Sequence, residues 1–173
     1  SAGKGGQTEI RVWSAGCAAG QEAYSVAILL DELAASRKYP VHFRIFATDR
    51  SRTELTAAQR GIYRRESLHN VRLKHLESWF SRRGDTFTIS GRIRQRVDFS
   101  WHDLLDERCG SPPASIYGDF DLILCSNLLY YYQAGIQQLI LSKLHQALTP
   151  RGYLVTGEVE KAAINQAGGF HAL

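Results

Sequence analysis

Short β-type runs alternate with amphipathic helical segments along most of this chain, and this alternation constrains the fold more than any other feature. Apolar residues recur at three- to four-residue spacing in the helical segments, and they alternate or run continuously in the others. The β-type runs are 10–13, 42–47, 96–99, 120–125 and 153–156, and the helical segments are 22–38, 51–59 and 136–148. This order predicts an α/β fold, with a doubly wound, mostly parallel sheet and helices on both faces.

The ends of several elements carry local signals. Ser51 and Glu54 have the spacing of a capping box, which predicts the start of helix 51–59, and Gly61 ends it. The Tyr39-Pro40 pair predicts the end of helix 22–38. Residues 149–152 predict a turn before the last strand.

Residues 62–95 are the least regular part of the chain. A helix is predicted over 73–80, and a β-hairpin over 86–94 with its turn at Ser90-Gly91. Residues 60–96 also hold ten Lys and Arg against three Asp and Glu, a net charge of 10 − 3 = +7 in a chain whose total is +4. This basic region predicts an anionic partner; the alternative is a solvated, arginine-rich face.

Composition narrows the class of protein. A chain of 173 residues that is 44% hydrophobic predicts one soluble domain over 1–173, and no apolar run reaches the roughly 18 residues of a membrane span. Cys17, Cys109 and Cys125 form no CxxC and the histidines form no zinc-site spacing, so we expect no metal and a reducing, cytoplasmic location. The chain holds no methionine, even at position 1, which predicts a piece of a longer protein.

Polar residues should form the functional site where they directly follow the strands, since ligands of such sheets bind at the carboxyl ends of the strands. The first strand runs into a loop of small residues that includes Ala15, Gly16 and Gly20, where backbone N–H groups can approach a ligand. The alternative is an ordinary glycine turn. Asp103, Ser126 and Asn127 follow two later strands, and for the last two a polar strand cap is the alternative.

Two acidic residues suggest the kind of ligand. Asp49 follows the second strand, where a carboxylate can accept both hydroxyls of a ribose, and Ser51 is the better helix cap and leaves Asp49 free. Glu22 at the start of the first helix suits a cationic group. For both, a helix N-terminal acid favoured by the helix dipole is the alternative. Because Gly16 and Gly20 do not form GxGxxG and Glu22 would repel a diphosphate, the pattern favours S-adenosylmethionine over a dinucleotide.

Several runs of this chain, in order and spacing, resemble the chemotaxis receptor methyltransferase (CheR) family over about residues 9–160. The resemblance rests on Val12 to Ser25, Phe46 to Asp49, Gly61 to Tyr63, Val97 to Leu105, Phe120 to Asn127, and Tyr131. It implies a Rossmann-like class I methyltransferase domain, with a small inserted β-subdomain at about 70–96 and without the family's N-terminal helical domain. It further implies that the domain methylates glutamate carboxylates of chemoreceptors with S-adenosylmethionine and releases S-adenosylhomocysteine.

The resemblance also implies roles for single residues. Glu22 would meet the methionine amino group and Asp49 the ribose, while Asp103 and Leu104 would flank the adenine. Ser126 and Asn127 would lie beside the methionine moiety. Tyr131 would stand near the transferring methyl group, and we expect its hydroxyl to orient the acceptor; the alternative for residues 130–132 is aromatic core packing.

Departures from the family pattern leave the acceptor open. Ser126 stands where the family usually has Arg, which could hold a substrate carboxylate in a bidentate pair, and 157–160 match the family only loosely. Two alternatives follow: the same donor with another acceptor, or a non-catalytic S-adenosylmethionine-binding sensor or scaffold. The expected partner is an acidic, chemoreceptor-like protein that binds region 60–96; nucleic acid is disfavoured because arginines and aromatics do not interleave there.

Overall fold

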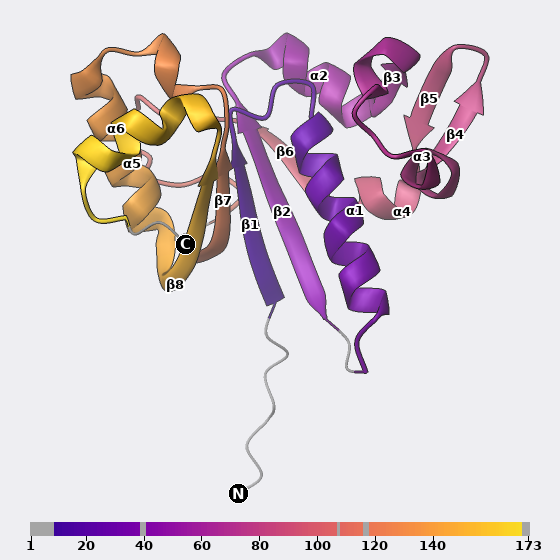
Figure 1. Cartoon of the computed structure of the whole chain (residues 1–173), viewed down its shortest axis with the longest axis horizontal. Helices are drawn as coiled ribbons and strands as arrows, with labels where there is room; N and C mark the ends of the chain where they lie inside the picture. The colour runs from indigo at the N-terminus through magenta and orange to yellow at the C-terminus, as the bar shows by residue number, and fades with distance from the viewer. Residues whose placement is uncertain (1–8, 39–40, 107, 116–117, 171–173) are drawn as a thin grey trace, which may run out of the picture.

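The computed structural model describes residues 9–38, 41–106, 108–115 and 118–170, and a parallel sheet forms its centre. Figure 1 shows the strands fanned across the middle of the molecule. In the order β6-β2-β1-β7-β8, the strands span Val97–Trp101, His42–Asp49, Glu9–Ala15, Phe120–Cys125 and Leu148–Thr156. All four pairings are parallel. The predicted α/β fold is confirmed, and the strand order reverses between β1 and β7, where such sheets bind ligands.

Helices cover both faces of the sheet because its central strands carry apolar residues on both faces. In β1, Val12 belongs to the core under α1 (Gln21–Ala35), whereas its neighbour Trp13 belongs to the core under α5 (Ala134–Ala147). Both side chains are fully buried. In β7 a nearly continuous apolar run supplies Leu124 to the first core and Ile123 to the second. A strand buried on both faces is what its composition predicts.

The helix after β2 begins and ends where the sequence predicts. The N-cap of α2 (Arg52–Arg60) is Ser51, whose hydroxyl accepts the backbone N–H of Glu54 at 3.3 Å. Gly61 ends the helix with φ of 62°, a left-handed conformation that favours glycine. The capping prediction is confirmed.

A second, antiparallel sheet lies at one end of the molecule, beyond α1 and α2 (Figure 1). In the order β3-β5-β4, its strands are Ile62–Arg64, Thr86–Ile89 and Phe80–Arg83. The short helices η1 (Arg65–Leu68) and α3 (Leu73–Trp79) connect β3 to β4. Strands β4 and β5 of this sheet lie within the β-subdomain predicted at about 70–96, whereas β3 precedes it.

The predicted hairpin over 86–94 is wrong. The strand Thr86–Ile89 pairs with residues before it, and the chain turns at Gly84, whose φ is 60°. Residues Gly91–Arg94 form the short helix α4 instead. A polar–apolar–polar triplet fits one helical turn as well as a strand, and here the turn buries Ile93 completely in the core under α1.

Three boundaries also differ from the predictions. Helix α1 ends at Ala35 rather than at residue 38, and the predicted terminator Tyr39-Pro40 lies outside the described residues. Strand β6 continues to Trp101. The predicted turn 149–152 belongs to β8, whose pairing with β7 shifts register between Phe120 and Leu122, so extra residues are accommodated inside the strand.

Within the described ranges, no helix has the length and apolarity needed to cross a bilayer, and no group of three or more His, Cys, Asp or Glu side chains could hold a metal ion. The three cysteines are free thiols, with Cys17 and Cys125 buried and Cys109 exposed.

Candidate functional site at the carboxyl ends of the strands

The loop between β1 and α1 folds back onto the end of β2. The backbone N–H groups of Gly16 and Cys17 both donate to the carbonyl of Thr48 at 2.9 Å. Gly20, the N-cap of α1, has φ of 84°, and a Cβ atom there would lie 3.0 Å from the ring of Phe99 and from Ala58. Glycine is therefore required at this position by both conformation and space.

The carboxylate of Asp49 connects this loop to α2. One oxygen accepts the N–H of Ala18 at 2.9 Å, and the other accepts the N–H of Ser51 at 2.8 Å. Ser51 is the cap of α2, as predicted. The sequence also suggested that Asp49 would be free of protein partners, but both of its carboxylate oxygens accept backbone N–H groups. Each carboxylate oxygen has a second lone pair, so the partly exposed Asp49 can still accept two ligand hydroxyls.

Glu22 lies in the first turn of α1 and turns back toward β1. Its carboxylate accepts the hydroxyl of Ser14 at 3.0 Å, and Ser14 is fully buried at the end of the strand. This hydrogen bond holds a negative charge beside the point where β1 and β7 diverge. Ala15 is also buried there, with 1% of its surface exposed.

The end of β7 carries Ser126 and Asn127, and Asn127 has a left-handed φ of 57°. The next residue, Leu128, donates its N–H to the carboxylate of Glu160 at 2.9 Å. Glu160 follows β8 and is 1% exposed, and sequence reasoning did not single it out. The one indication in the sequence was that Glu160 lies within residues 157–160, which match the family pattern only loosely.

The thiol of Cys125, the last residue of β7, is affected by two acidic side chains, Glu160 and Glu22. Burial and, to a smaller extent, the negative charges of Glu160 and Glu22 together raise the pKa of the Cys125 thiol to about 12. The ends of β1, β7 and β8 therefore meet in an environment where negative charge is already present before any ligand binds.

Tyr131 lies on the 3₁₀ turn η2 (Leu129–Tyr131) and is 71% exposed. Its ring lies against that of Tyr130, with centroids 4.1 Å apart, and a hydrogen bond with Tyr131 is the main cause that raises the pKa of Tyr130. Only Tyr132 packs against the core under α5. Tyr131 is thus exposed beside Tyr130 and is not part of the core under α5.

The loop after β6 is fixed by a residue that the sequence did not indicate. Lys143 of α5 donates its ammonium group to the carbonyls of Leu104 at 2.8 Å and Asp106 at 2.7 Å. Within the loop, a carboxylate oxygen of Asp103 accepts the N–H of Leu105 at 2.9 Å, and Leu104 is buried. Asp103 and Leu104 are therefore held at the same edge of the sheet as Asp49.

His102 directly follows β6 and is 5% exposed, with its ring edge-on to Trp13 at 5.8 Å between centroids. Within the described part of the chain, its buried Nε2 has no hydrogen-bond partner. Burial lowers the pKa of His102, and the positive charge of Lys143 lowers it further. The folded protein therefore takes up this proton less readily than the unfolded chain.

We expect the free energy of unfolding to fall as the pH drops below the ordinary histidine pKa of about 6.5, because the unfolded chain then binds a proton that folded His102 excludes. The loss continues down to the lowered pKa of the folded state, with a limiting slope of about 1.4 kcal/mol per pH unit. Urea unfolding between about pH 7.5 and pH 5 measures it. The His102→Gln variant should lose this part of the slope; identical slopes in both proteins would contradict the assignment.

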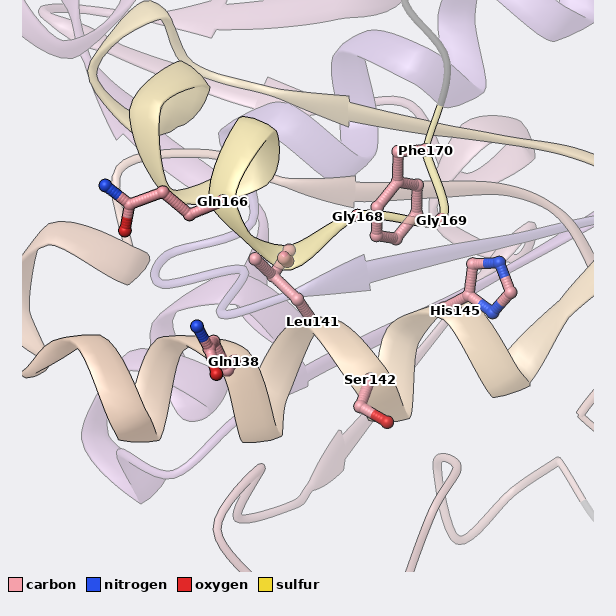
Figure 2. A pocket seen from close by; sticks show the side chains of 9 residues that line it. Gln138, Leu141, Ser142, His145, Gln166, Gly168, Gly169 and Phe170 are labelled. Carbon is pink, nitrogen blue, oxygen red and sulfur yellow. The ribbon is translucent and has the colours of Figure 1, made fainter.

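Two cavities lie away from the strand ends. Figure 2 shows one of about 390 Å³ between α5 and the end of α6 (Lys161–Ala167), where His145 and Phe170 are among the lining side chains. The other, of about 640 Å³, lies beside the small sheet, between η1, α3 and β5. None of the predicted donor-binding residues lines either cavity. The candidate site is instead assembled at the edge of the sheet.

The basic region 60–96 is less uniform than its charge suggests. Arg92 pairs with the buried carboxylate of Asp31 at 2.9 Å, and Arg96 lies over the ring of Phe43. Arg82 stacks on a core phenylalanine, whereas Arg83 is exposed at the end of β4. Across the described ranges, Arg92 is the one arginine of this region in an ion pair.

Comparison with known proteins connects these features. Residues 2–172 match the family described as CheR methyltransferase, SAM binding domain. The chain is 36% identical over 160 residues to chemotaxis protein methyltransferase 1 of Pseudomonas aeruginosa, covering 90% of this chain and 56% of that protein. It is 35% identical over 156 residues to the chemotaxis protein methyltransferase of Escherichia coli, covering 88% and 52%. The chain thus spans about half the length of these relatives.

Solved structures agree on the fold. The structure of PKMT2 from Rickettsia typhi in complex with AdoHcy aligns with a TM-score of 0.51 at 17% identity, over 85% of this chain and 20% of that one. The DszA carbon methyltransferase aligns with a TM-score of 0.54 at 18% identity, over 89% and 30%. Together with the sequence match, the observed sheet and its loops establish that this chain belongs to the CheR methyltransferase family, as its S-adenosylmethionine-binding domain.

Proposed function

We propose that this domain binds S-adenosylmethionine across the ends of β1, β2 and β7 and transfers its methyl group to a carboxylate, most directly a glutamate side chain of a chemoreceptor-type protein. One observation carries the proposal. Two carboxylates flank the loop that follows β1: Asp49 accepts the N–H of Ala18 in that loop, and Glu22 accepts the hydroxyl of Ser14 near the end of β1, beside the point where the strand order reverses. In the proposal, one of these acids accepts the ribose hydroxyls of the ligand and the other faces its amino group.

The residues of this edge fit that donor. Asp49 would accept the ribose hydroxyls, Glu22 would face the α-amino group, and the loop through Gly16 and Gly20 admits a ligand close to the backbone. Asp103 and Leu104 would flank the base. One buried oxygen of Glu160 lacks a hydrogen-bond partner among the described residues. A ligand that brings a hydrogen-bond donor or a positive charge would satisfy this oxygen.

Methyl transfer to a carboxylate requires the protein to align donor and acceptor, and it does not require a general base. The bound donor supplies a methyl group on a positively charged sulfur and leaves as a neutral thioether. A carboxylate acceptor is already ionised at neutral pH, so no proton has to be removed. The chain's task is to hold donor and acceptor in line at about 3 Å. In the proposal, the exposed residue Tyr131 orients the acceptor through its hydroxyl.

The proposed substrate is an acidic protein surface. The relatives named as chemotaxis protein methyltransferases support a chemoreceptor-like substrate, and exposed side chains of the basic region, Arg83 among them, support binding to acidic segments. Ser126, which stands where the family usually has arginine, favours a second candidate: transfer from the same donor to another acceptor. Three free thiols are consistent with a reducing, cytoplasmic setting.

Two measurements test the proposal in sequence. Calorimetry with S-adenosylmethionine and S-adenosylhomocysteine tests binding, and transfer of a labelled methyl group to chemoreceptor proteins tests catalysis. Base-labile label on glutamate residues is expected. Label on other groups would favour the second candidate, binding without transfer to any acceptor would indicate a sensor or scaffold, and failure to bind either ligand would overturn the proposal.

The Tyr131→Phe variant should transfer methyl groups about tenfold more slowly than the parent, because one hydrogen bond that orients the acceptor is lost. Its affinity for S-adenosylmethionine should not change. Labelled-methyl turnover at saturating donor measures the effect. Tyr153→Phe, at an exposed tyrosine of β8, serves as the matched control. Turnover of Tyr131→Phe equal to that of the parent would remove this role.

A further inference from the structure

Glu160 is an acidic residue whose side chain is buried in the folded protein. It belongs to the short turn η3 (Glu158–Glu160) after β8 and is 1% exposed. One carboxylate oxygen accepts the N–H of Leu128 at 2.9 Å. The other is buried and has no hydrogen-bond partner among the described residues. Burial of a carboxylate oxygen without a donor costs free energy, so such a group calls for an explanation.

The unpartnered oxygen lies beside Gly157 and close to Asn127, the second residue after β7. A Cβ atom built on Gly157 would lie 2.6 Å from this oxygen and 3.4 Å from the side-chain oxygen of Asn127. The glycine thus leaves room for the carboxylate, and Asn127 faces the same spot from the end of β7. Glu160 also connects two sequence-distant segments, because its other oxygen fixes Leu128 in the segment that leads to Tyr131.

Glu22 is a second carboxylate near the end of the same strand. Glu22, held by Ser14, and Glu160 both act on the thiol of Cys125 at the end of β7. Two negative charges therefore approach one point at the sheet edge, and one of them lies in the low-dielectric interior. Charge interactions are stronger there than at a solvated surface.

We propose that Glu160 is a specificity-determining and positioning residue that favours a positively charged sulfonium over a neutral thioether at the end of β7, while it holds the segment from Leu128 to Tyr131 in place. The inference rests on the proposed function, in which S-adenosylmethionine binds at this edge. The donor and its demethylated product share the adenosine and the α-amino acid, and they differ in the methyl group and the sulfur's charge. A buried carboxylate near the sulfur distinguishes them by that charge and so promotes exchange of product for donor.

The Glu160→Gln variant separates this electrostatic role from a structural one. Glutamine keeps an acceptor for the Leu128 N–H but removes the charge. Calorimetry should show that affinity for S-adenosylmethionine falls about five- to tenfold more than affinity for S-adenosylhomocysteine. The matched control is Glu158→Gln, because Glu158 lies two residues away with its side chain 88% exposed. The control should leave the ratio of the two affinities unchanged.

Each remaining outcome has a distinct meaning. Equal weakening of both ligands by Glu160→Gln, or no weakening of either, would overturn the inference and leave Glu160 as a structural cap. Failure of the parent protein to bind either ligand would overturn the proposed function itself. Should Glu160→Gln fail to fold, as judged by thermal unfolding, Gly157→Ala provides the second test. Its Cβ must displace the unpartnered oxygen and should change the affinity ratio about two- to threefold; an unchanged ratio would overturn the inference.

Discussion

Replacement of Asp49 by alanine is expected to weaken S-adenosylmethionine binding about 100-fold. The variant loses the acceptor for two ribose hydroxyls, and hydrogen bonds to charged groups contribute about 1.5–3 kcal/mol each. It also leaves the N–H groups of Ala18 and Ser51 without their present acceptor, so the loop and the start of α2 lose the group that joins them. Calorimetric titration with S-adenosylmethionine measures the change.

Two further variants make the Asp49 result specific. Asp49→Asn keeps one oxygen acceptor and removes the charge, so its loss should be intermediate, about tenfold. Asp98→Ala removes a carboxylate of the neighbouring strand β6, where it pairs with Arg44 and, within the described residues, forms no hydrogen bond with a candidate site residue. The control should bind as the parent does. A change of less than about threefold for Asp49→Ala would contradict the ribose role.

The sequence predicted the central sheet well because the relevant signals are local. Continuous apolar runs identify β7, and a capping serine and a terminal glycine delimit α2 from both ends. Since each βαβ connection has one favoured hand, the alternation of these elements is enough to place Asp49 and the glycine loop at one edge. The positions of Asp49, Glu22 and Asn127 at the carboxyl ends of the strands follow from the order of the elements alone, whereas the role of Tyr131 is predicted only by the resemblance to the CheR family.

Features that depend on distant partners could not be predicted in this way. Ile93 sits in a triplet that fits a strand or a helical turn equally well, and packing against α1 decides between them. Glu160 meets Leu128 across 32 residues of sequence, and Lys143 meets Leu104 across 39. No local pattern marks an acid for burial or a lysine for two carbonyl groups. Such residues are found when the chain has folded, by what they contact.

Trp13→Ala is expected to lower the free energy of unfolding by about 3–5 kcal/mol, a large part of the stability of a typical domain. Trp13 is fully buried at the middle of the sheet, where its ring packs against Phe120 at 5.5 Å and lies edge-on to His102. Alanine would leave a cavity under α5 that the rigid strands on either side could fill only in part. Urea unfolding at neutral pH measures the loss, and a value below about 1 kcal/mol would contradict this account.

The indole of Trp13 also connects the core to the candidate site. Its Nε1 donates to the hydroxyl of Thr48 at 2.9 Å, and Thr48 immediately precedes Asp49. Thr48→Val should cost about 1–3 kcal/mol because it leaves the buried indole N–H without an acceptor. Combined with Trp13→Phe, the same change should cost less than the sum of the single losses, since both partners are then absent. Strict additivity in this double-mutant cycle would show that the hydrogen bond between Trp13 and Thr48 contributes nothing to stability.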